Sequence, residues 1–388
     1  MTLGDFAVFP ALEALPKSAA ALLDGIGCER LFTSRPWYDT FISAGLMPGA
    51  RPLFFVLNDQ FGKARALLPC RRNADGEPAV SSLTSFYSCD FRPLIATDGD
   101  PSATAFELGR RLAQYLRSEA VFGLDSLDSS NPALEPFLSG LAYPGRALLR
   151  YEHFGRWWES LGGRSYGEYL GARAGALREV IRRKGAKLER AGASFALVGI
   201  GSPQAEVEQG IADYEAVYGA SWKEAEPFEQ FQPTLMRKLA AAGWLRLAIC
   251  RMEGRPIAAQ LWVVVGSTAT VLKLAHDREF DAQSPGTILT AFAIRTLLDK
   301  EGIALLDFGR GDDAYKRTWT TQRTPHIGVL SASVTRRPML VAGHLIGAAM
   351  RKWRGVDSPA SAGISYHPVD ASRVLLTDAE KKLSGFAE

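Results

Sequence analysis

The chain has 388 residues, 47% of them apolar and 22% charged, which is enough for two or three domains with buried cores. A formal net charge of +3 is close to neutral and does not favour a DNA-binding protein. The four cysteines form no CxxC pair, and the sequence has no HExxH motif or His/Cys cluster, so we expect reduced thiols and no metal.

The first half shows alternating and helical patterns in a clear order. Apolar residues at helical spacing predict helices, and short apolar runs bounded by turn residues predict strands. The predicted elements are a hairpin with strands at 52–57 and 64–71, a helix at 104–117, a strand at 121–127 and a short helix at 131–141.

The second half repeats the order of hairpin, helix and strand. Its predicted elements are helices at 166–190, 203–218, 233–242 and 285–300 and strands at 245–251, 257–265, 270–276, 303–308 and 327–334. Hairpins followed by helices are typical of an α+β fold, and the repeated order indicates an internal duplication. We therefore predict an N-terminal half at 1–150, a C-terminal catalytic half at 151–335 and an amphipathic tail at 336–388.

The start of the helix at 285–300 is a candidate anion site. Ser284 is a favoured N-cap residue and Pro285 a favoured first helical residue. Gly286 leaves room for a ligand, and the N–H groups of Gly286 and Thr287 lie at the positive end of the helix dipole. An ordinary capped helix explains the same residues, so both interpretations stay open here.

The strand at 303–308 runs into a loop that is dense in ionisable groups, which reads DFGRGDDAYKRTW over 307–319. An acid at a strand end can orient or deprotonate an amine, a phenol can protonate a leaving thiolate, and an ammonium group can stabilise an oxyanion. Asp307, Tyr315 and Lys316 are therefore candidate catalytic residues, and His276, at the end of its strand, is a further candidate base. A strand end with a solvated acidic loop is the alternative.

This loop resembles the signature of the CelD/BcsL-like branch of the GNAT superfamily, written DF-x-x-Gly-(Asp)-x-x-Tyr-Lys. The segment LREVIRRK at 177–184 and the segment SPGT at 284–287 are similar to the same branch, and the resemblance covers about 165–319. It implies two tandem GNAT-like (acyl-CoA N-acyltransferase) halves, related to FemAB-type proteins, followed by a C-terminal helical tail. It also implies that Gln283, Ser284, Gly286 and Thr287 bind the pyrophosphate of the donor.

Three other segments carry open interpretations. Basic residues dominate 173–190, which predicts a solvated helix face or a binding site. Such a site would bind the phosphates of CoA, with Arg182 as a ligand, an acidic acyl carrier protein or an anionic membrane. Hydroxyl and aromatic groups alternate at 82–91, as in a half-buried strand or a substrate wall between the halves. The apolar middle and basic ends of 336–354 are typical of an interfacial or a docked helix.

We expect N-acyl transfer by direct attack of a primary amine on an acyl thioester, since no activated serine or cysteine is apparent. The donor is acyl-CoA or an acyl carrier protein, and the acceptor is a small amine, amino-lipid or amino-sugar of a lipid or envelope-polysaccharide pathway. Alternatives are a tRNA-dependent FemAB-like aminoacyltransferase and a non-catalytic GNAT-like subunit of a polysaccharide-assembly complex. With no signal peptide evident and no apolar run of about 20 residues, we expect a cytoplasmic protein, peripheral on an inner membrane face and without DNA as a partner.

Overall fold

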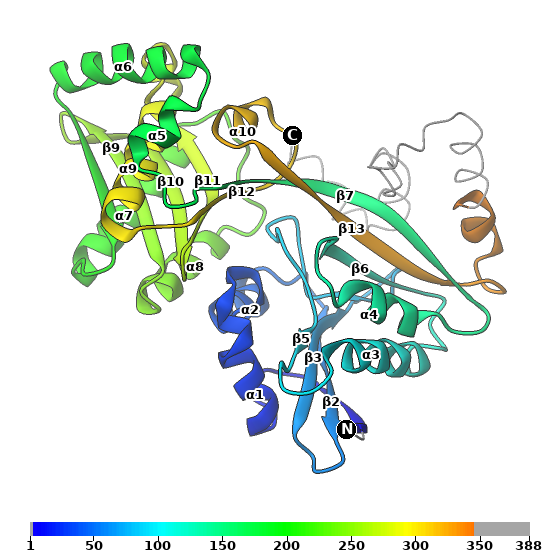
Figure 1. Cartoon of the computed structure of the whole chain (residues 1–388). Coiled ribbons are helices and arrows are strands. Elements are labelled where there is room, and N and C mark those ends of the chain that lie inside the picture. The colour runs from blue at the N-terminus through cyan, green and yellow to red at the C-terminus, as the bar shows by residue number, and fades with distance from the viewer. Residues whose placement is uncertain (1–2, 345–388) are drawn as a thin grey trace. The chain divides into compact units, whose positions relative to one another are not determined.

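The computed structural model describes residues 3–344 and divides into two compact units (Figure 1). Unit 1 comprises Met1–Gly155 with Thr324–Glu388, and unit 2 comprises Arg156–Arg323. This division differs from the boundary predicted at 335, because the last described strand, β13 (Gln322–Ser333), pairs with a strand of unit 1.

Unit 1 has most of its strands in one sheet. Besides β13, unit 1 has the strands β1 (Leu3–Phe9), β2 (Arg51–Asp59), β3 (Ala64–Arg72), β4 (Val80–Ser82), β5 (Leu94–Ile95) and β6 (Val121–Asp128). Strand β7 (Arg146–Ser160) begins in this unit and ends in unit 2. Its helices are α1 (Lys17–Asp24), α2 (Arg35–Ala44), α3 (Pro101–Tyr115) and α4 (Leu134–Leu141), with short 3₁₀ turns η1 (Ile26–Glu29) and η2 (Leu31–Thr33).

The sheet of unit 1 runs in the order β1-β2-β3-β4-β6-β13. Neighbouring strands are antiparallel except for β4 and β6, which are parallel. Helices α3 and α4 pack against one face, where Phe55 and Leu68 of the sheet join Leu108 and Phe137 of the helices in one buried cluster. The apolar stripe of α3 that the sequence predicts therefore faces the sheet.

Unit 2 has the second set of elements. Its helices are α5 (Tyr166–Gly171), α6 (Gly175–Arg190), α7 (Gln204–Gly219), α8 (Phe231–Ala241), α9 (Pro285–Glu301) and α10 (Ala314–Trp319), with a 3₁₀ turn η3 (Arg278–Gln283). Its strands are β8 (Ala193–Gly199), β9 (Leu245–Met252), β10 (Arg255–Val265), β11 (Thr268–His276) and β12 (Leu305–Arg310), beside the end of β7.

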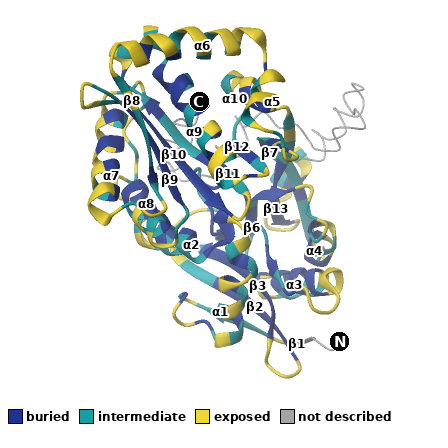
Figure 2. Cartoon of the chain, turned by 60° about the vertical axis from the view of Figure 1, so that its left-hand side comes forward, coloured by how far each residue is buried: buried dark blue, intermediate teal, exposed yellow. Residues whose placement is uncertain are grey.

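The sheet of unit 2 is covered on both faces, and its central strands are almost wholly buried (Figure 2). Helices α5, α6 and α9 share one cluster with Ala248, Cys250 and Trp262. On the opposite face, α7 approaches β8 and β9 so closely that a Cβ at Gly210 would lie 3.1 Å from Leu247 Cδ2. Burial on both faces explains the unbroken apolar runs of β9 and β10.

The two units repeat one order of elements. Each has a strand, two helices, three antiparallel strands, a helix, a strand that is parallel to the third of these, a short helix and then a long strand. The first series is β1-α1-α2-β2-β3-β4-α3-β6-α4-β7, with the two-residue β5 added before α3, and the second is β8-α7-α8-β9-β10-β11-α9-β12-α10-β13. The order that the sequence predicted for the halves is thus confirmed, as is the α+β architecture. Strands β1, β5, β7 and β8 and helices α1, α2 and α10 were not predicted.

Three predicted segments come out differently or lie outside the described residues. The prediction of a single helix at 166–190 is wrong. The backbone is extended at Ala174, which divides the segment into α5 and α6. The segment at 82–91 contains only the end of β4 and then irregular chain. Most of the predicted tail lies beyond residue 344, although Leu340 and Val341 pack with Leu149 of unit 1. Within residues 3–344, no helix is long and apolar enough to cross a membrane.

Candidate functional site

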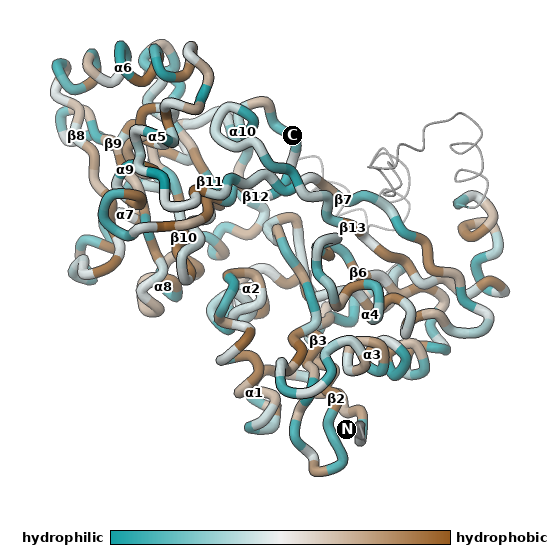
Figure 3. Tube along the Cα trace, in the orientation of Figure 1, coloured by the Kyte–Doolittle hydropathy of each residue, from teal (hydrophilic) through white to brown (hydrophobic). Residues whose placement is uncertain are grey.

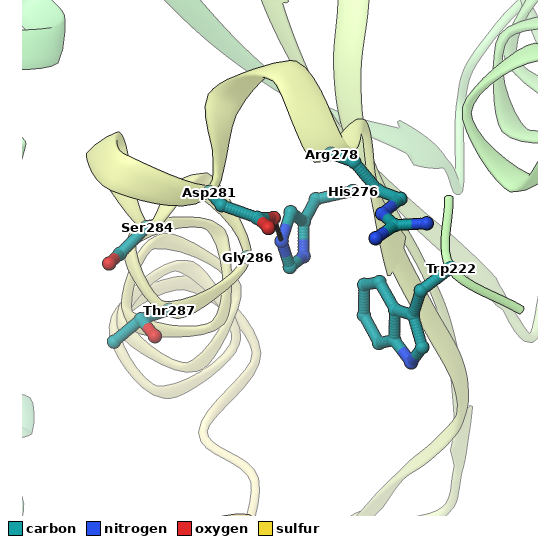
Figure 4. Close-up of a pocket in the computed structure, with 7 residues that line it drawn as sticks. All are labelled: Trp222, His276, Arg278, Asp281, Ser284, Gly286 and Thr287. Carbon is teal, nitrogen blue, oxygen red and sulfur yellow. Dashed lines mark hydrogen bonds and ion pairs between the residues drawn. The ribbon is translucent and has the colours of Figure 1, made fainter. Parts of the chain in front are cut away.

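A pocket of about 390 Å³ opens at the end of β11 in unit 2 (Figure 4). It is formed by the last residue of β11, the turn η3, the first turn of α9 and the loop between α7 and α8. Its lining residues are Trp222, His276, Arg278, Asp281, Ser284, Gly286 and Thr287. Four of the predicted site residues thus lie together: His276, Ser284, Gly286 and Thr287.

The start of α9 forms one wall of this pocket. Ser284 has φ 54° and ψ 47°, in the left-handed region, and its side chain does not cap a backbone N–H, so the predicted N-cap bond is wrong. A helix leaves its first N–H groups without partners inside the helix, and Pro285 has no N–H. Gly286 and Thr287 therefore bring two backbone donors and the positive end of the helix dipole to the pocket wall.

A basic residue of α6 reaches the same loop, but it is not the predicted one. Lys184 Nζ donates a hydrogen bond to Ser284 Oγ at 2.7 Å. Arg182 instead has a side chain that is 75% exposed and pairs with Glu179 on its own helix, at 2.7 Å. In an α-helix, Lys184 follows Ile181 and precedes Leu188 on the packed face, whereas Arg182 faces solvent. The structure thus puts Lys184, in place of Arg182, beside the anion site.

His276 stands between the start of α9 and Trp222. Its Nε2 lies 2.7 Å from Asp281 Oδ1, and its ring lies 4.7 Å from the ring of Trp222, centroid to centroid. A Cβ at Gly286 would come to 3.3 Å from His276 Nδ1, so glycine is what lets the helix start so close to the imidazole. The site residues are therefore held by packing and hydrogen bonds among themselves.

The strands beside the pocket separate along their length. Strands β11 and β12 are parallel neighbours over three residue pairs, Thr268 with Leu305 to Thr270 with Asp307. In the described residues, both strands continue past Thr270 and Asp307 without further pairing to each other. Strand β11 then has backbone groups that face no strand on this side, and such an edge can take an extended ligand by backbone hydrogen bonds.

Comparisons with known proteins place this arrangement in a family. A family model described as an acetyltransferase (GNAT) domain matches residues 175–317, which include the pocket and the separating strands. Residues 175–317 therefore form a GNAT-type acyltransferase domain. No curated protein sequence matches it.

Solved structures resemble almost the whole chain. FemX is 12% identical with a TM-score of 0.54, over 81% of this chain and 94% of that one. A tandem GNAT protein from the clavulanic acid biosynthesis pathway is 12% identical with a TM-score of 0.50, over 84% of this chain and 98% of that one. A conserved Bacteroides thetaiotaomicron protein is 12% identical with a TM-score of 0.51, over 84% and 100%. At these identities the likeness concerns the fold, and it supports two GNAT-like halves.

Within the GNAT domain, Tyr315 is joined to the start of α9. Its hydroxyl oxygen lies 2.5 Å from Thr290 Oγ1, and Thr290 donates to the Gly286 carbonyl at 3.0 Å. Because Thr290 uses its proton on that carbonyl, Tyr315 is the donor of the shorter bond. Gln260 Nε2 also donates to this carbonyl, at 2.9 Å. Burial raises the pKa of Tyr315, so its phenol is protonated at neutral pH.

Asp307 does not lie where an amine could reach it. Its carboxylate is 1% exposed and pairs with Arg156 at 2.7 Å, while Oδ1 accepts from the backbone N–H of Gly309 at 2.9 Å. A buried carboxylate that is held by a guanidinium and a backbone N–H has its oxygens occupied. We therefore interpret Asp307 as a residue that fixes the end of β12, a correction to the base expected from the sequence.

Lys316 is also engaged within its own loop. Its Nζ donates to the Arg310 carbonyl, contacts the Gly311 carbonyl at 3.4 Å and pairs with Asp313 at 2.9 Å. These bonds close the loop between β12 and α10. We therefore interpret Lys316 as a positioning residue, whereas the sequence predicts it as an oxyanion ligand.

Gln283 ends the turn before α9, and its side-chain carbonyl oxygen is buried without a hydrogen-bond partner in the described residues. A phosphate needs donors, so that oxygen brings nothing to an anion site. Sequence reasoning missed Trp222, Arg278 and Asp281, which come from turns whose closeness to α9 only the fold reveals. No signal in the sequence marks Trp222, because its 48% exposure is visible only in the fold.

A cluster of buried acids lies elsewhere, in unit 1. Asp90, Asp128 and His326 have side-chain atoms close enough together to share one cation. Arg92 Nη2 already lies 3.0 Å from Asp90 Oδ2 and 2.9 Å from Asp128 Oδ2. The guanidinium supplies the positive charge that these acids require, and we interpret the cluster as an ion-pair network.

Proposed function

We propose that this acyltransferase moves an acyl group from an acyl thioester to a primary amine. The observation that carries the proposal is the pocket at the start of α9, beside the strands that separate after Thr270. A diphosphate would accept hydrogen bonds from the N–H groups of Gly286 and Thr287 and would meet the charge of Lys184. The extended arm of the thioester would then follow the open edge of β11.

The positive charge around the pocket is consistent with a phosphorylated donor. Arg278 lines the pocket and Lys184 contacts its rim. His276 lies next to Gly286, at the wall proposed for the donor's phosphates, and its ring bonds Asp281. We therefore propose that His276 and Asp281 support donor binding.

The chemistry requires one bond to form and one to break. The amine nitrogen attacks the thioester carbonyl, the C–N bond forms and the C–S bond breaks, and the sulfur leaves as a thiolate. Tyr315 is proposed as the general acid that protonates this thiolate. Direct attack is favoured because burial raises the pKa of the Cys70 and Cys250 thiols, the latter to about 12, so neither is an activated nucleophile.

The acceptor is proposed to be an amine of a lipid or envelope-polysaccharide precursor that is met at an anionic membrane surface. The observation in favour is helix α6, whose outer face is hydrophilic and largely exposed (Figure 3). Its exposed basic residues are Arg178, Arg182, Arg183, Lys187 and Arg190. Binding to anionic liposomes should fall with added salt if this face docks on lipid.

The same basic face is the reason to keep a second candidate, aminoacyl transfer from tRNA. A protein that neutralises several phosphates loses affinity steeply as salt rises. Binding of bulk tRNA in a filter assay that competes with CoA would favour this candidate, and tRNA binding that leaves CoA binding unchanged would count against it.

A thermal-shift experiment tests the proposed donor. A ligand at 100 times its dissociation constant adds about 2.7 kcal/mol to the stability of the folded state. We expect CoA and a long-chain acyl-CoA to raise the melting temperature, and adenosine to have no effect at the same concentration. If neither CoA species stabilises the protein, either the donor is an acyl carrier protein or the proposal is wrong. An assay for the release of free thiol from an acyl carrier protein decides between these two explanations.

A further inference from the structure

A buried network of polar side chains joins the first turn of α9 to the proposed acid Tyr315. Its central members, Gln260 of β10 and Thr290 of α9, are completely buried. Gln260 Nε2 donates to the Gly286 carbonyl at 2.9 Å and lies 2.8 Å from Thr290 Oγ1. Thr290 Oγ1 in turn lies 2.5 Å from the Tyr315 hydroxyl. Buried polar groups are costly unless they are bonded, and here they bond one another.

The chemistry of the side chains fixes the direction of each bond in this network. The indole N–H of Trp262 can only donate, and it lies 2.9 Å from Gln260 Oε1. The amide nitrogen of Gln260 therefore faces the other way, and its two N–H groups go to the Gly286 carbonyl and to Thr290 Oγ1. Thr290 donates its own proton to the same carbonyl, at 3.0 Å. Its oxygen is left to accept, so the Tyr315 hydroxyl donates to it.

The Gly286 carbonyl thus has two donors, of which only one can turn away. A hydroxyl proton rotates to suit its acceptor, whereas the N–H groups of an amide stay in the plane of the amide. If the Thr290 hydroxyl turns toward Tyr315, the carbonyl keeps its bond from Gln260. The first turn of α9 then stays bonded while Thr290 changes from the acceptor to the donor in its bond with Tyr315.

A second donor acts on the Tyr315 hydroxyl. Trp319 is completely buried, and among the described residues its Nε1 has no hydrogen-bond partner. Its ring lies 6.3 Å from the ring of Tyr315, centroid to centroid. Burial raises the pKa of Tyr315, and the side chains of Thr290 and Trp319 act in the opposite direction. A buried N–H without an acceptor is costly, and a negatively charged oxygen beside it would satisfy it.

We propose that Thr290 and Trp319 stabilise the phenolate that Tyr315 becomes when it protonates the leaving thiolate. Gln260 keeps the first turn of α9 bonded meanwhile, so all three are positioning residues. This inference rests on the proposed function, because it explains how the proposed acid works. The C–S bond breaks, the sulfur takes the phenol proton, and the Thr290 hydroxyl turns to the phenolate oxygen. The nitrogen of the new amide then gives a proton to water, and water returns one to Tyr315.

Titration of the phenol itself tests this without an acyl acceptor. In the full chain, 3,5-difluorotyrosine in place of Tyr315 makes the phenol more acidic and gives a ¹⁹F NMR signal that reports its ionisation. Thr290→Val replaces the hydroxyl by a methyl group of similar shape, and Thr290→Ser keeps the hydroxyl. We expect the midpoint to rise by about one pH unit in Thr290→Val, because the bond to the charged phenolate is the stronger one that is lost, and to stay the same in Thr290→Ser.

Two further variants keep the test decisive if Thr290→Val does not fold. Trp319→Phe removes the indole N–H, and Gln260→Leu leaves Thr290 as the only side-chain donor to the carbonyl, so each should raise the midpoint. Thr296→Val is the matched control, because Thr296 also donates to a carbonyl of α9, that of Phe292 at 2.8 Å, but belongs to no part of the network. The same midpoint in the natural chain and in these folded variants overturns the proposal.

A double-mutant cycle on thiol release from acetyl-CoA shows whether Thr290 acts through Tyr315. With ethanolamine or glucosamine as the amine, Thr290→Val should lower kcat about 10-fold and leave the affinity for CoA almost unchanged. In the Tyr315→Phe background the same change should cause no further loss, because no phenolate forms there. A loss of the same size in both backgrounds overturns the proposal, since Thr290 would then act on something else.

The two assays together separate this inference from the proposed function. If the midpoint rises in Thr290→Val but no thiol is released with either amine, the stabilised phenolate stands and the result counts against the proposed transfer. If Tyr315→Phe lowers kcat but the midpoint is the same in every folded variant, the proposed acid stands and the positioning residues are wrong.

Discussion

Lys184 of α6 and Ser284 at the start of α9 are joined by a hydrogen bond of 2.7 Å, although 100 positions separate them in the chain. The bond brings a positive charge to a helix start that already has two backbone N–H groups at a pocket wall. Basic side chains and helix starts attract the same ligands, namely anions. Their convergence is the reason to assign this end of the pocket to the phosphates of a donor.

The first prediction concerns this lysine. Lys184→Met should weaken CoA binding about 10-fold, because a charge-assisted hydrogen bond to a phosphate is lost. Lys187→Met is the matched control, since Lys187 lies on the exposed face of the same helix. Calorimetry on both variants provides the measurement, and equal affinities in the two would show that the α6 lysine has no part in donor binding.

The second prediction concerns proton transfer. Tyr315→Phe should lower kcat by about 100-fold, since general acid catalysis contributes about that much, while the affinity for CoA should change little. Tyr166→Phe is a suitable control, because Tyr166 packs against the same apolar cluster from α5. A Tyr315→Phe variant with the turnover of the natural protein would leave the tyrosine a packing residue only.

The third prediction concerns stability. Glu159 and Arg173 are 4% and 5% exposed in their side chains and pair at 2.8 Å. Burial alone would raise the pKa of Glu159, but hydrogen bonds from Thr321 and Arg164 and the charge of Arg173 hold it below its usual range. Glu159→Gln leaves the buried guanidinium of Arg173 without its counter-ion, and we expect a loss of about 3 kcal/mol in the free energy of unfolding at pH 7.

The pH dependence of this loss follows from the direction of the shift. A group whose pKa is lower in the folded state stabilises the fold above its unfolded pKa, about 4.3 for glutamate, and this contribution is lost as the pH falls through the lower folded value. Urea unfolding at pH 7 and pH 3 should therefore show the difference between Glu159→Gln and the natural protein shrinking at the acidic pH. A difference that is constant over this range would mean that the carboxylate charge is not the cause.

The fourth prediction concerns Lys223, which follows the pocket residue Trp222 in the loop between α7 and α8. Reductive methylation with ¹³C-labelled formaldehyde, followed by NMR titration, should give one lysine signal with a midpoint near pH 8, assigned to Lys223 by its loss in Lys223→Arg. Lys273→Met should move this midpoint upward, because the positive charge of Lys273, which lowers the pKa most after burial, is removed. A midpoint near pH 10 for Lys223 would show that its ammonium is solvated and that neither burial nor the neighbouring lysines act on it.

The sequence predicted most hairpins and helices because their apolar residues recur at strand or helix spacing. Strand β7 was missed since Arg146, Arg150 and Arg156 interrupt its pattern, and its neighbours are distant in sequence. The break at Ala174 was missed because Arg173 looks like one more basic helix residue, although its guanidinium is buried against Glu159 and the Trp319 carbonyl.

The site was predicted in composition more than in arrangement. Ser284, Gly286 and Thr287 are at the pocket because a helix start carries its own signal in the sequence. Asp307 looked catalytic because strand ends commonly are, but only the fold shows Arg156 opposite it at 2.7 Å. Trp222 and Lys223 gave no motif, and their place depends on a loop that meets η3 in three dimensions.

Calorimetric titration of CoA into the natural protein and into Gly286→Asp tests the central claim most directly. The aspartate would place a carboxylate where the donor's phosphates are proposed to bind, while Gly286→Ala adds only a Cβ at 3.3 Å from His276 Nδ1 and serves as the control for crowding. We predict that CoA binds the natural protein and Gly286→Ala, and that Gly286→Asp, folded by circular dichroism, loses at least about 10-fold in affinity. A folded Gly286→Asp that binds CoA as tightly as the natural protein would contradict the account.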